Sequence, residues 1–235
     1  MLSPMPRIAR IVLPEIPHHV TQRGNNREAV FFDDDDRRMY LELLRDHADR
    51  FGAKLWAYCL MPNHVHLVIE PRAEDSLAKA VGRTNFRYAQ RLNLTHGRSG
   101  HLWQNRFFSC ALDDMHLWRA IRYVERNPVR ARMVRLPWRY AWSSAAAHVG
   151  EADGGGLLDL AAWRREWTPS RWRTQLEHLD NDQMKAIRDH THTGRPLGDD
   201  RFLDALERRL DRRMRPLPIG RPPTRETQSK GRINR

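Results

Sequence analysis

The sequence predicts an α+β fold in which helices pack on an antiparallel sheet. Residues 18–24 (HHVTQRG) alternate as a strand does, and the apolar segments 53–62 and 63–71 meet at Pro62-Asn63 like the strands of a hairpin. Residues 101–114 (HLWQNRFFSCALDD) form a further strand-like segment rich in aromatic residues. With the helical patterns, the order becomes strand, helix, strand, strand, helix, strand, helix. This order is typical of a ferredoxin-like sandwich with one added helix.

Three helical patterns separate and follow these strands. In the first, four aspartates at 33–36 precede a run of apolar residues at helical spacing, which predicts that a helix begins there. Four carboxylates could also bind a cation, but we favour a solvated first turn stabilised by the helix dipole. The second pattern, residues 76–93, is amphipathic, and the third, residues 116–126, is expected to break near Pro128.

The composition bounds the kind of protein and its partners. The chain has 235 residues, of which 40% are hydrophobic, so it can bury a core in one domain with an appendage. With 41 basic and 29 acidic residues, the net charge of +12 favours a polyanionic partner such as nucleic acid. GC-rich coding could explain why arginine exceeds lysine, but it does not explain the sign of the net charge.

The cysteines and the hydropathy indicate a cytoplasmic protein. Cys59 and Cys110 are too few for a disulfide framework or a four-cysteine zinc site, which fits a reducing compartment. The apolar run at 8–13 is short and contains Arg10, so we expect neither a signal peptide nor a membrane span.

The second half of the chain changes in character at residues 151–156 (EADGGG), which we expect to be a flexible linker. Helical patterns follow at 157–167, 173–190 and 199–214, and the final residues are rich in proline and arginine. The predicted organisation is therefore a first domain at 1–150, a helical accessory region at 151–215 and a basic, disordered tail at 216–235.

Two histidines share one face of a predicted strand. In MPNHVHLVIEP, residues 61–71, side chains at i and i+2 point the same way, so His64 and His66 lie side by side. Two imidazoles on a rigid strand can form half of a metal site. They can equally be partly buried and hydrogen-bonded to backbone, and the pattern alone does not decide between the two.

A tyrosine and an asparagine occupy one face of the predicted helix that contains IRYVERNPVR. Tyr123 and Asn127 are four residues apart, and residues 119–139 hold seven arginines with a single acidic residue, Glu125. The tyrosine could attack a phosphodiester while the arginines hold the DNA backbone, and the amide could join two imidazoles around a divalent cation. Alternatively, Tyr123 is a half-buried helix residue and Asn127 a helix-end residue before proline.

The ordered set of motifs resembles the REP-associated tyrosine transposases, a group within the single-tyrosine HUH class. MPNHVHLVIEP followed by YVERNPVRARMV carries the resemblance, which covers roughly residues 5–150. Three further segments are similar to this family: GNNREAVFFDDDDRRMYLELL, GHLWQNRFFS and WRYAWSS.

The resemblance implies a fold, a set of site residues and an activity. It implies an HUH-type catalytic domain at 1–150 with the ferredoxin-like fold, in which His64 and His66 are the metal pair and Tyr123 is the nucleophile. Asn127 matches the polar residue that completes the metal site. The implied activity is cleavage and rejoining of single-stranded DNA at hairpin-forming palindromic repeats, through a 5′-phosphotyrosine and a free 3′-hydroxyl.

The ligand set departs from a carboxylate-containing site. Two imidazoles and one amide suit Mg²⁺ or Mn²⁺, completed by water and phosphate, better than tightly bound zinc. Glu70 has the parity of His66 but lies four strand residues away, about 13 Å, so we do not expect it to bind the same ion.

Several other residues are candidate DNA contacts. We expect the protein to be nucleoid-associated and to bind DNA hairpins as a monomer or a homodimer. The His-x-His at 190–192 is predicted to be a loop, and the segments GRPLG and GRPPT resemble minor-groove hooks but are favoured as linkers. Two alternatives to the transposase remain open: a metal nuclease that uses water as the nucleophile, and a domesticated hairpin-binding protein with little catalysis. The predicted DNA contacts are Arg119, Arg122, Arg126, Arg130, Arg106 and Trp103.

Overall fold

An antiparallel sheet in the order β2-β3-β1-β4 lies at the centre of the computed structural model, which describes residues 11–178 and 181–215. Helices α1 and α2 connect its strands in the chain order β1, α1, β2, β3, α2, β4. This order and topology confirm the ferredoxin-like α+β fold. The strands are β1 (His18–Arg23), β2 (Ala53–Met61), β3 (His64–Pro71) and β4 (Phe108–Ala111).

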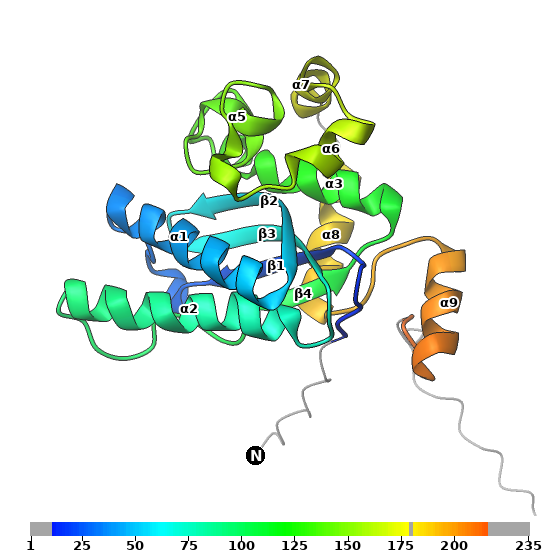
Figure 1. Cartoon of the computed structure of the whole chain (residues 1–235), viewed down its shortest axis with the longest axis horizontal. Helices are drawn as coiled ribbons and strands as arrows, with labels where there is room; N and C mark the ends of the chain where they lie inside the picture. The colour runs from blue at the N-terminus through cyan, green and yellow to red at the C-terminus, as the bar shows by residue number, and fades with distance from the viewer. Residues whose placement is uncertain (1–10, 179–180, 216–235) are drawn as a thin grey trace, which may run out of the picture.

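One face of the sheet is covered by α1 (Asp34–Phe51) and α2 (Ser76–Thr95), as Figure 1 shows. The side chains of Val65 and Leu67 on β3 point into this apolar layer. The expected start of α1 is confirmed, because the Asp33 carboxylate accepts the backbone N–H of the third helical residue at 2.8 Å and caps the helix.

The opposite face is covered by α3 (Asp114–Glu125) and α8 (Asn181–Thr193), which lie behind the sheet in Figure 1. The helix predicted at 116–126 ends before Pro128, as expected, because proline starts a separate short helix, α4 (Asn127–Arg130). The residues of β3 whose side chains point to the same face of the strand as Val68 therefore face α3.

The remaining helices lie beyond the two edges of the sheet. Around β2 are α5 (Ala145–His148), α6 (Leu160–Glu166) and α7 (Pro169–Glu177), while α9 (Asp200–Leu210) packs near β4 (Figure 1). Trp163, Trp172 and Leu176 share a core with residues of α3, so the C-terminal helices and the sheet are packed together. Short 3₁₀ helices lie at Asn25–Arg27, Pro137–Arg139 and Gly154–Gly156.

The structure corrects three local expectations. Of the segment 101–114, only residues 108–111 join the sheet as a strand, and Trp103 makes an isolated bridge to Gly24. The single pattern at 173–190 corresponds to two helices, α7 and α8. The loop predicted at 190–192 is wrong, because these residues form the last turn of α8, where Ile187 and Thr191 at i and i+4 are both buried.

The first Gly-Arg-Pro segment connects α8 to α9 and is tied to the sheet edge. The backbone N–H of Leu197 donates to the carbonyl of Ala111 at 2.8 Å, and the Arg195 guanidinium donates to the carbonyl of Met214 at 2.8 Å. These contacts agree with a connecting role. The second segment, GRPPT, and the tail at 216–235 lie outside the described residues.

None of the helices within residues 11–178 and 181–215 has the length and apolar character that a bilayer span requires.

Candidate active site

The two histidines of β3 lie side by side on the face that α3 covers. The ring centroids of His64 and His66 are 5.0 Å apart, with their planes at 81°. His66 is 6% exposed, and His64 at the start of the strand is half-buried. Since β3 pairs with a strand on each side, the backbone that carries both rings is held rigidly.

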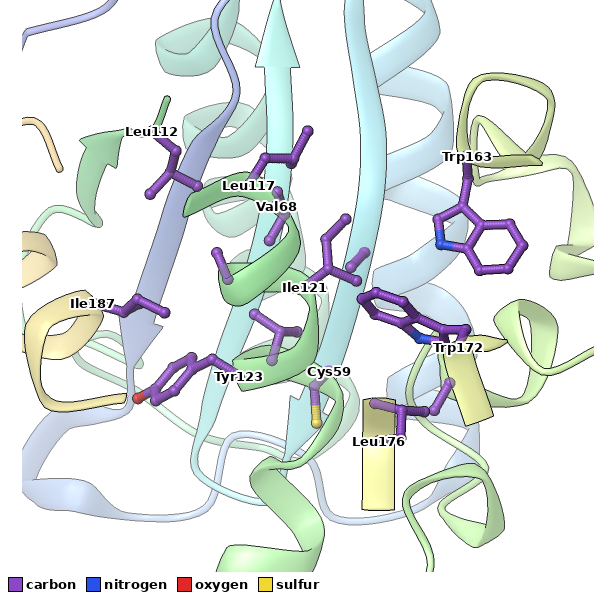
Figure 2. Close-up of a cluster of buried hydrophobic side chains, with 14 of the residues drawn as sticks. Cys59, Val68, Leu112, Leu117, Ile121, Tyr123, Trp163, Trp172, Leu176 and Ile187 are labelled. Atoms are coloured by element: carbon purple, nitrogen blue, oxygen red, sulfur yellow. The ribbon is translucent and has the colours of Figure 1, made fainter. Parts of the chain in front are cut away.

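Tyr123 reaches this pair from α3. Its ring centroid lies 5.6 Å from that of His66 and 5.5 Å from that of His19, both in edge-to-face contact. The guanidinium carbon of Arg130 lies 4.3 Å from the centre of the same ring. Figure 2 shows the tyrosine leaving α3 toward the helix that carries Ile187. Three of the predicted residues, His64, His66 and Tyr123, therefore gather at one place, where Tyr123 is 4% exposed.

Asn127 lies one helical turn beyond the tyrosine and is also 4% exposed. Its amide nitrogen donates to the carbonyl oxygens of Tyr123 and Val124, each at 3.3 Å, and its Oδ1 accepts a hydrogen bond from Arg130. In this arrangement Asn127 closes the end of α3, and its partners in the described part of the chain include neither imidazole. Its role as a metal ligand stays a prediction.

Sequence reasoning missed a third histidine. His19 on β1 places its Nε2 3.0 Å from Nδ1 of His66, and its own Nδ1 lies 2.7 Å from Oγ1 of Thr191 on α8. The signal was present, because 18–24 was predicted as a strand with a His-His pair, but its pairing with β3 could not be read from that segment. In the observed register, Thr21 lies opposite His66 and His19 is the next residue of β1 on that face.

Burial keeps the imidazoles neutral. It lowers the pKa of His19 to about 3, assisted by the charge of Arg130. The pKa of His64 falls to about 4 through burial and the charges of Arg23 and Arg130. Burial, followed by the neighbouring histidines, lowers the pKa of His66 well below its ordinary value. Neutral rings retain the lone pairs that bind a metal ion.

The donor atoms fit a metal ion at the histidine pair. His64 Nδ1 bonds to Oδ1 of Asn63 at 2.6 Å and His66 Nδ1 to His19, whereas neither Nε2 has a hydrogen-bond partner among the residues the structure describes. Metal-binding histidines show this division, with one ring nitrogen held by the protein and the other turned to the ion. The pair thus fits two ligands of a divalent cation.

Two sets of carboxylates that could have bound a cation are engaged elsewhere. Glu70 accepts a hydrogen bond from the indole N–H of Trp56 at 3.0 Å, which agrees with its exclusion as a ligand. Asp33, Asp36 and His96 bring ligand atoms within 4.8 Å of one another. Each of these two carboxylates already accepts a backbone N–H at the start of α1, and the group lies on the other side of the sheet, so we interpret it as a helix cap.

Two arginines flank the exposed side of the histidine pair. Arg23, the last residue of β1, and Arg130 of α4 are both exposed, and both act electrostatically on His64. Arg23 was not among the sequence-predicted residues, although it lies within the predicted strand 18–24. This rim of positive charge suits a phosphate group.

The other predicted DNA contacts are dispersed. Arg119 and Arg122 are half-buried on α3. Arg126 is 5% exposed and donates to the carbonyl of Leu176, so its guanidinium faces α7 rather than solvent. Burial lowers the pKa of Arg126, assisted by the charges of Arg122 and Arg130.

Trp103 and Arg106 border a groove on the side of the sheet that α2 covers, opposite the histidine pair. Trp103 is half-buried, and its indole donates to the carbonyl of Asn85 at 2.9 Å. The groove runs between α2 and residues 100–107, has a volume of about 800 Å³, and is lined by exposed Arg106 and by Phe86, which is 59% exposed.

This fold and this site define a class of protein. A ferredoxin-like sheet with a His-hydrophobic-His pair on an inner strand, facing a tyrosine on a following helix, is the arrangement implied for single-tyrosine HUH transposases. Residues 13–127 match the family described as Transposase IS200 like, so the chain carries a domain of that family. The resemblance predicted from the sequence motifs is confirmed.

Two of the solved structures that are similar to this chain are transposases. A REP-associated tyrosine transposase bound to a REP hairpin matches with a TM-score of 0.50 at 17% identity, over 70% of this chain and 92% of that one. A transposase described as putative from Deinococcus radiodurans matches with a TM-score of 0.36 at 19% identity, over 54% of this chain and 97% of that one. No curated protein matches the chain.

Proposed function

We propose that this chain cleaves and rejoins single-stranded DNA at hairpin-forming palindromic repeats, with Tyr123 as the nucleophile. The proposal is carried by one observation, the contact of the tyrosine ring with His66, His19 and Arg130 at 5.6, 5.5 and 4.3 Å. A phenol in this position lies next to neutral imidazoles that can bind a metal ion and a guanidinium that can bind phosphate.

In the proposed reaction, Oη of Tyr123 attacks the phosphorus of a phosphodiester. The Oη–P bond forms and the bond from phosphorus to the 3′ oxygen breaks. The phenolic proton passes to water, and the departing 3′ oxygen takes up a proton. The products are a 5′-phosphotyrosine and a 3′-hydroxyl, so attack by that hydroxyl rejoins the strand without ATP.

His64 and His66 would hold Mg²⁺ or Mn²⁺ through Nε2, with the amide oxygen of Asn127 as the third protein ligand. When bound, the ion would supply positive charge to a non-bridging phosphate oxygen. Oδ1 of Asn127 accepts a hydrogen bond from Arg130, and the second lone pair of this amide oxygen would be the one offered to the ion. Arg130 is exposed, so its guanidinium would also be accessible to the incoming phosphate.

The basic surface supports DNA as the partner. Arg23 and Arg130 would position the scissile phosphate, and Arg119 and Arg122 would contact the backbone along α3. Arg106 and Trp103 border the groove where unpaired bases could stack. Arg126 is not assigned a DNA contact in this proposal, because it holds α7. The hairpin substrate is supported by the solved transposase of the same fold, which is bound to a REP hairpin.

The test is Tyr123→Phe, with Tyr58→Phe as the matched control on the other face of the sheet. With a labelled single-stranded hairpin and Mn²⁺, the unmodified protein and Tyr58→Phe should form a covalent protein–DNA adduct. Tyr123→Phe should form none while its hairpin affinity is unchanged. Cleavage by Tyr123→Phe at an undiminished rate would assign the nucleophile to water, and an unmodified protein that binds but never cleaves would be a hairpin-binding protein.

A further inference from the structure

A buried chain of hydrogen bonds joins α8 to the histidine pair. Oγ1 of Thr191 lies 2.7 Å from the carbonyl oxygen of Ile187 and 2.7 Å from Nδ1 of His19, whose Nε2 lies 3.0 Å from Nδ1 of His66. Thr191 and His19 are each 1% exposed and His66 is 6% exposed, so water does not compete for these bonds.

The two imidazoles meet through their edges. Their planes differ by 7°, and their centroids are 5.2 Å apart while the two nitrogens are 3.0 Å apart. That centroid separation is close to the largest that a 3.0 Å contact between two five-membered rings allows, so the rings of His19 and His66 lie nearly in one plane. Ring N–H bonds and lone pairs lie in that plane, as a hydrogen bond requires.

The position of each proton in the chain follows from its first member. A carbonyl oxygen only accepts, so the single hydroxyl proton of Thr191 is donated to Ile187. Oγ1 then accepts from His19, whose proton must be on Nδ1. His19 is 1% exposed, and its two ring nitrogens face a hydroxyl and an imidazole rather than a carboxylate, so the ring is neutral. Its Nε2 therefore carries a lone pair and accepts from Nδ1–H of His66.

The second neighbour of the threonine is compatible with this order. Sγ of Cys110 lies 3.2 Å from Oγ1 of Thr191, and burial raises the pKa of that thiol to about 12, so it keeps its proton and can donate. The hydroxyl of Thr191 therefore donates once and accepts twice, which uses its full hydrogen-bonding capacity.

We infer that Thr191 and His19 are positioning residues that hold His66 in the Nδ1–H tautomer, so that its Nε2 lone pair faces the site where a divalent cation would bind. The inference rests on the metal site of the proposed function. It goes beyond that function in giving α8 a role in the chemistry of β3, through two residues that touch neither metal nor DNA.

Removing the threonine hydroxyl should reverse the order of the protons. In Thr191→Val, which keeps the shape of the side chain, Nδ1–H of His19 has no acceptor. His19 regains an acceptor if its proton moves to Nε2, because Nε2–H can donate to Nδ1 of His66. His66 must then carry its own proton on Nε2. The lone pair that the metal needs is lost, and the loss of such an outer partner weakens metal affinity about 10–100-fold. Thr191→Ser keeps the hydroxyl and is the matched control.

The first measurement uses the metal-free full-length protein labelled with ¹⁵N in its histidines. Two-bond ¹H–¹⁵N correlations report which ring nitrogen carries the proton, and His66→Gln assigns the signals. The unmodified protein and Thr191→Ser should show His66 as the Nδ1–H tautomer, and Thr191→Val should show a shift to Nε2–H. A merely structural role of Thr191 would not move this signal.

The second measurement is a titration with Mn²⁺ alone, followed by the electron paramagnetic resonance of the free ion. Affinity should fall about 10–100-fold in Thr191→Val and in His19→Leu, and stay within a few-fold in Thr191→Ser and in His19→Gln, whose amide oxygen can accept from His66. An Nε2–H tautomer of His66 in the unmodified protein, or wild-type Mn²⁺ affinity in Thr191→Val, overturns the inference. If the unmodified protein binds no Mn²⁺, the metal site of the proposed function fails. The tautomer of His66 measured by NMR then still decides whether Thr191 and His19 set the position of its proton.

Discussion

Replacing Glu125 by glutamine should destabilise the protein strongly, although the side chain keeps its size. Glu125 is fully buried at the end of α3, two residues from Tyr123. Its Oε1 accepts from Oγ of Ser144 and from Nδ1 of His148, each at 2.5 Å, and its Oε2 accepts from the indole N–H of Trp172 at 2.8 Å. Three buried donors from the α5 and α7 regions thus converge on one carboxyl group.

The expected loss of stability follows from counting the three buried donors that need an acceptor. The amide of glutamine has one oxygen, which can accept at most two of the three bonds, while its NH₂ group meets the remaining donor. One buried donor without an acceptor costs about 1–3 kcal/mol, and the two surviving bonds each lose about 1 kcal/mol when the acceptor is no longer charged. We expect a loss of about 3–5 kcal/mol, the range observed when one partner of a buried pair is removed.

Urea denaturation followed by tryptophan fluorescence measures this loss. The control is Glu151→Gln, whose carboxylate is paired at the surface with Arg173 at 2.9 Å and Arg139 at 3.9 Å, and whose removal should cost less than about 1 kcal/mol. If Glu125→Gln costs no more than this control, the three bonds do not hold α3 to the C-terminal helices, and the reasoning is refuted.

Two further predictions concern pH and salt. In the presence of a chelator, lowering the pH from 7 to 5 should reduce the free energy of unfolding, because unfolded histidines bind protons near pH 6.5 whereas the pKa of His64 is about 4 and that of His19 about 3. Urea midpoints at both pH values check this, and His19→Gln should lose less than the unmodified protein; an equal loss would contradict it. Deleting residues 216–235, which hold five basic residues and one acidic, should weaken binding to all DNA and flatten its salt dependence, by about 0.7 in log–log slope per lost phosphate contact on single strands. The cleavage position should not change, and a deletion that redirects cleavage would show that the Gly-Arg-Pro segment reads bases.

The parts of the site that the sequence predicted are those that local geometry determines. His64 and His66 share a face because a strand alternates, whatever surrounds it. The helix around Tyr123 could be predicted from its apolar spacing, and its relation to the strand came from the resemblance of the ordered motifs. Each inference needed only neighbours within a few residues or a known family pattern.

The parts that were missed depend on packing between distant segments. His19 and Thr191 are 172 residues apart, and no local pattern indicates that their side chains meet. The same holds for Arg126, which has the composition of a DNA contact but donates to the carbonyl of Leu176 on α7. The turn at 190–192 was misread because threonine and histidine are weak helix formers, and its burial against β1 and β4 outweighs that propensity.

The hydrogen bonds that connect Thr191 and His19 to His66 also bear on where the polypeptide should be divided into domains. A boundary at residue 150 separates all four sequence-predicted site residues from the C-terminal helices, and the family match ends at residue 127. Yet the proton order of His66 begins at a carbonyl of α8, and α3 is held through Glu125 by Trp172 of α7. The proposed metal ligands thus all precede residue 150, whereas the orientation inferred for His66 depends on residues on both sides of that boundary. The shortest segment that contains the whole site therefore extends at least to Thr191.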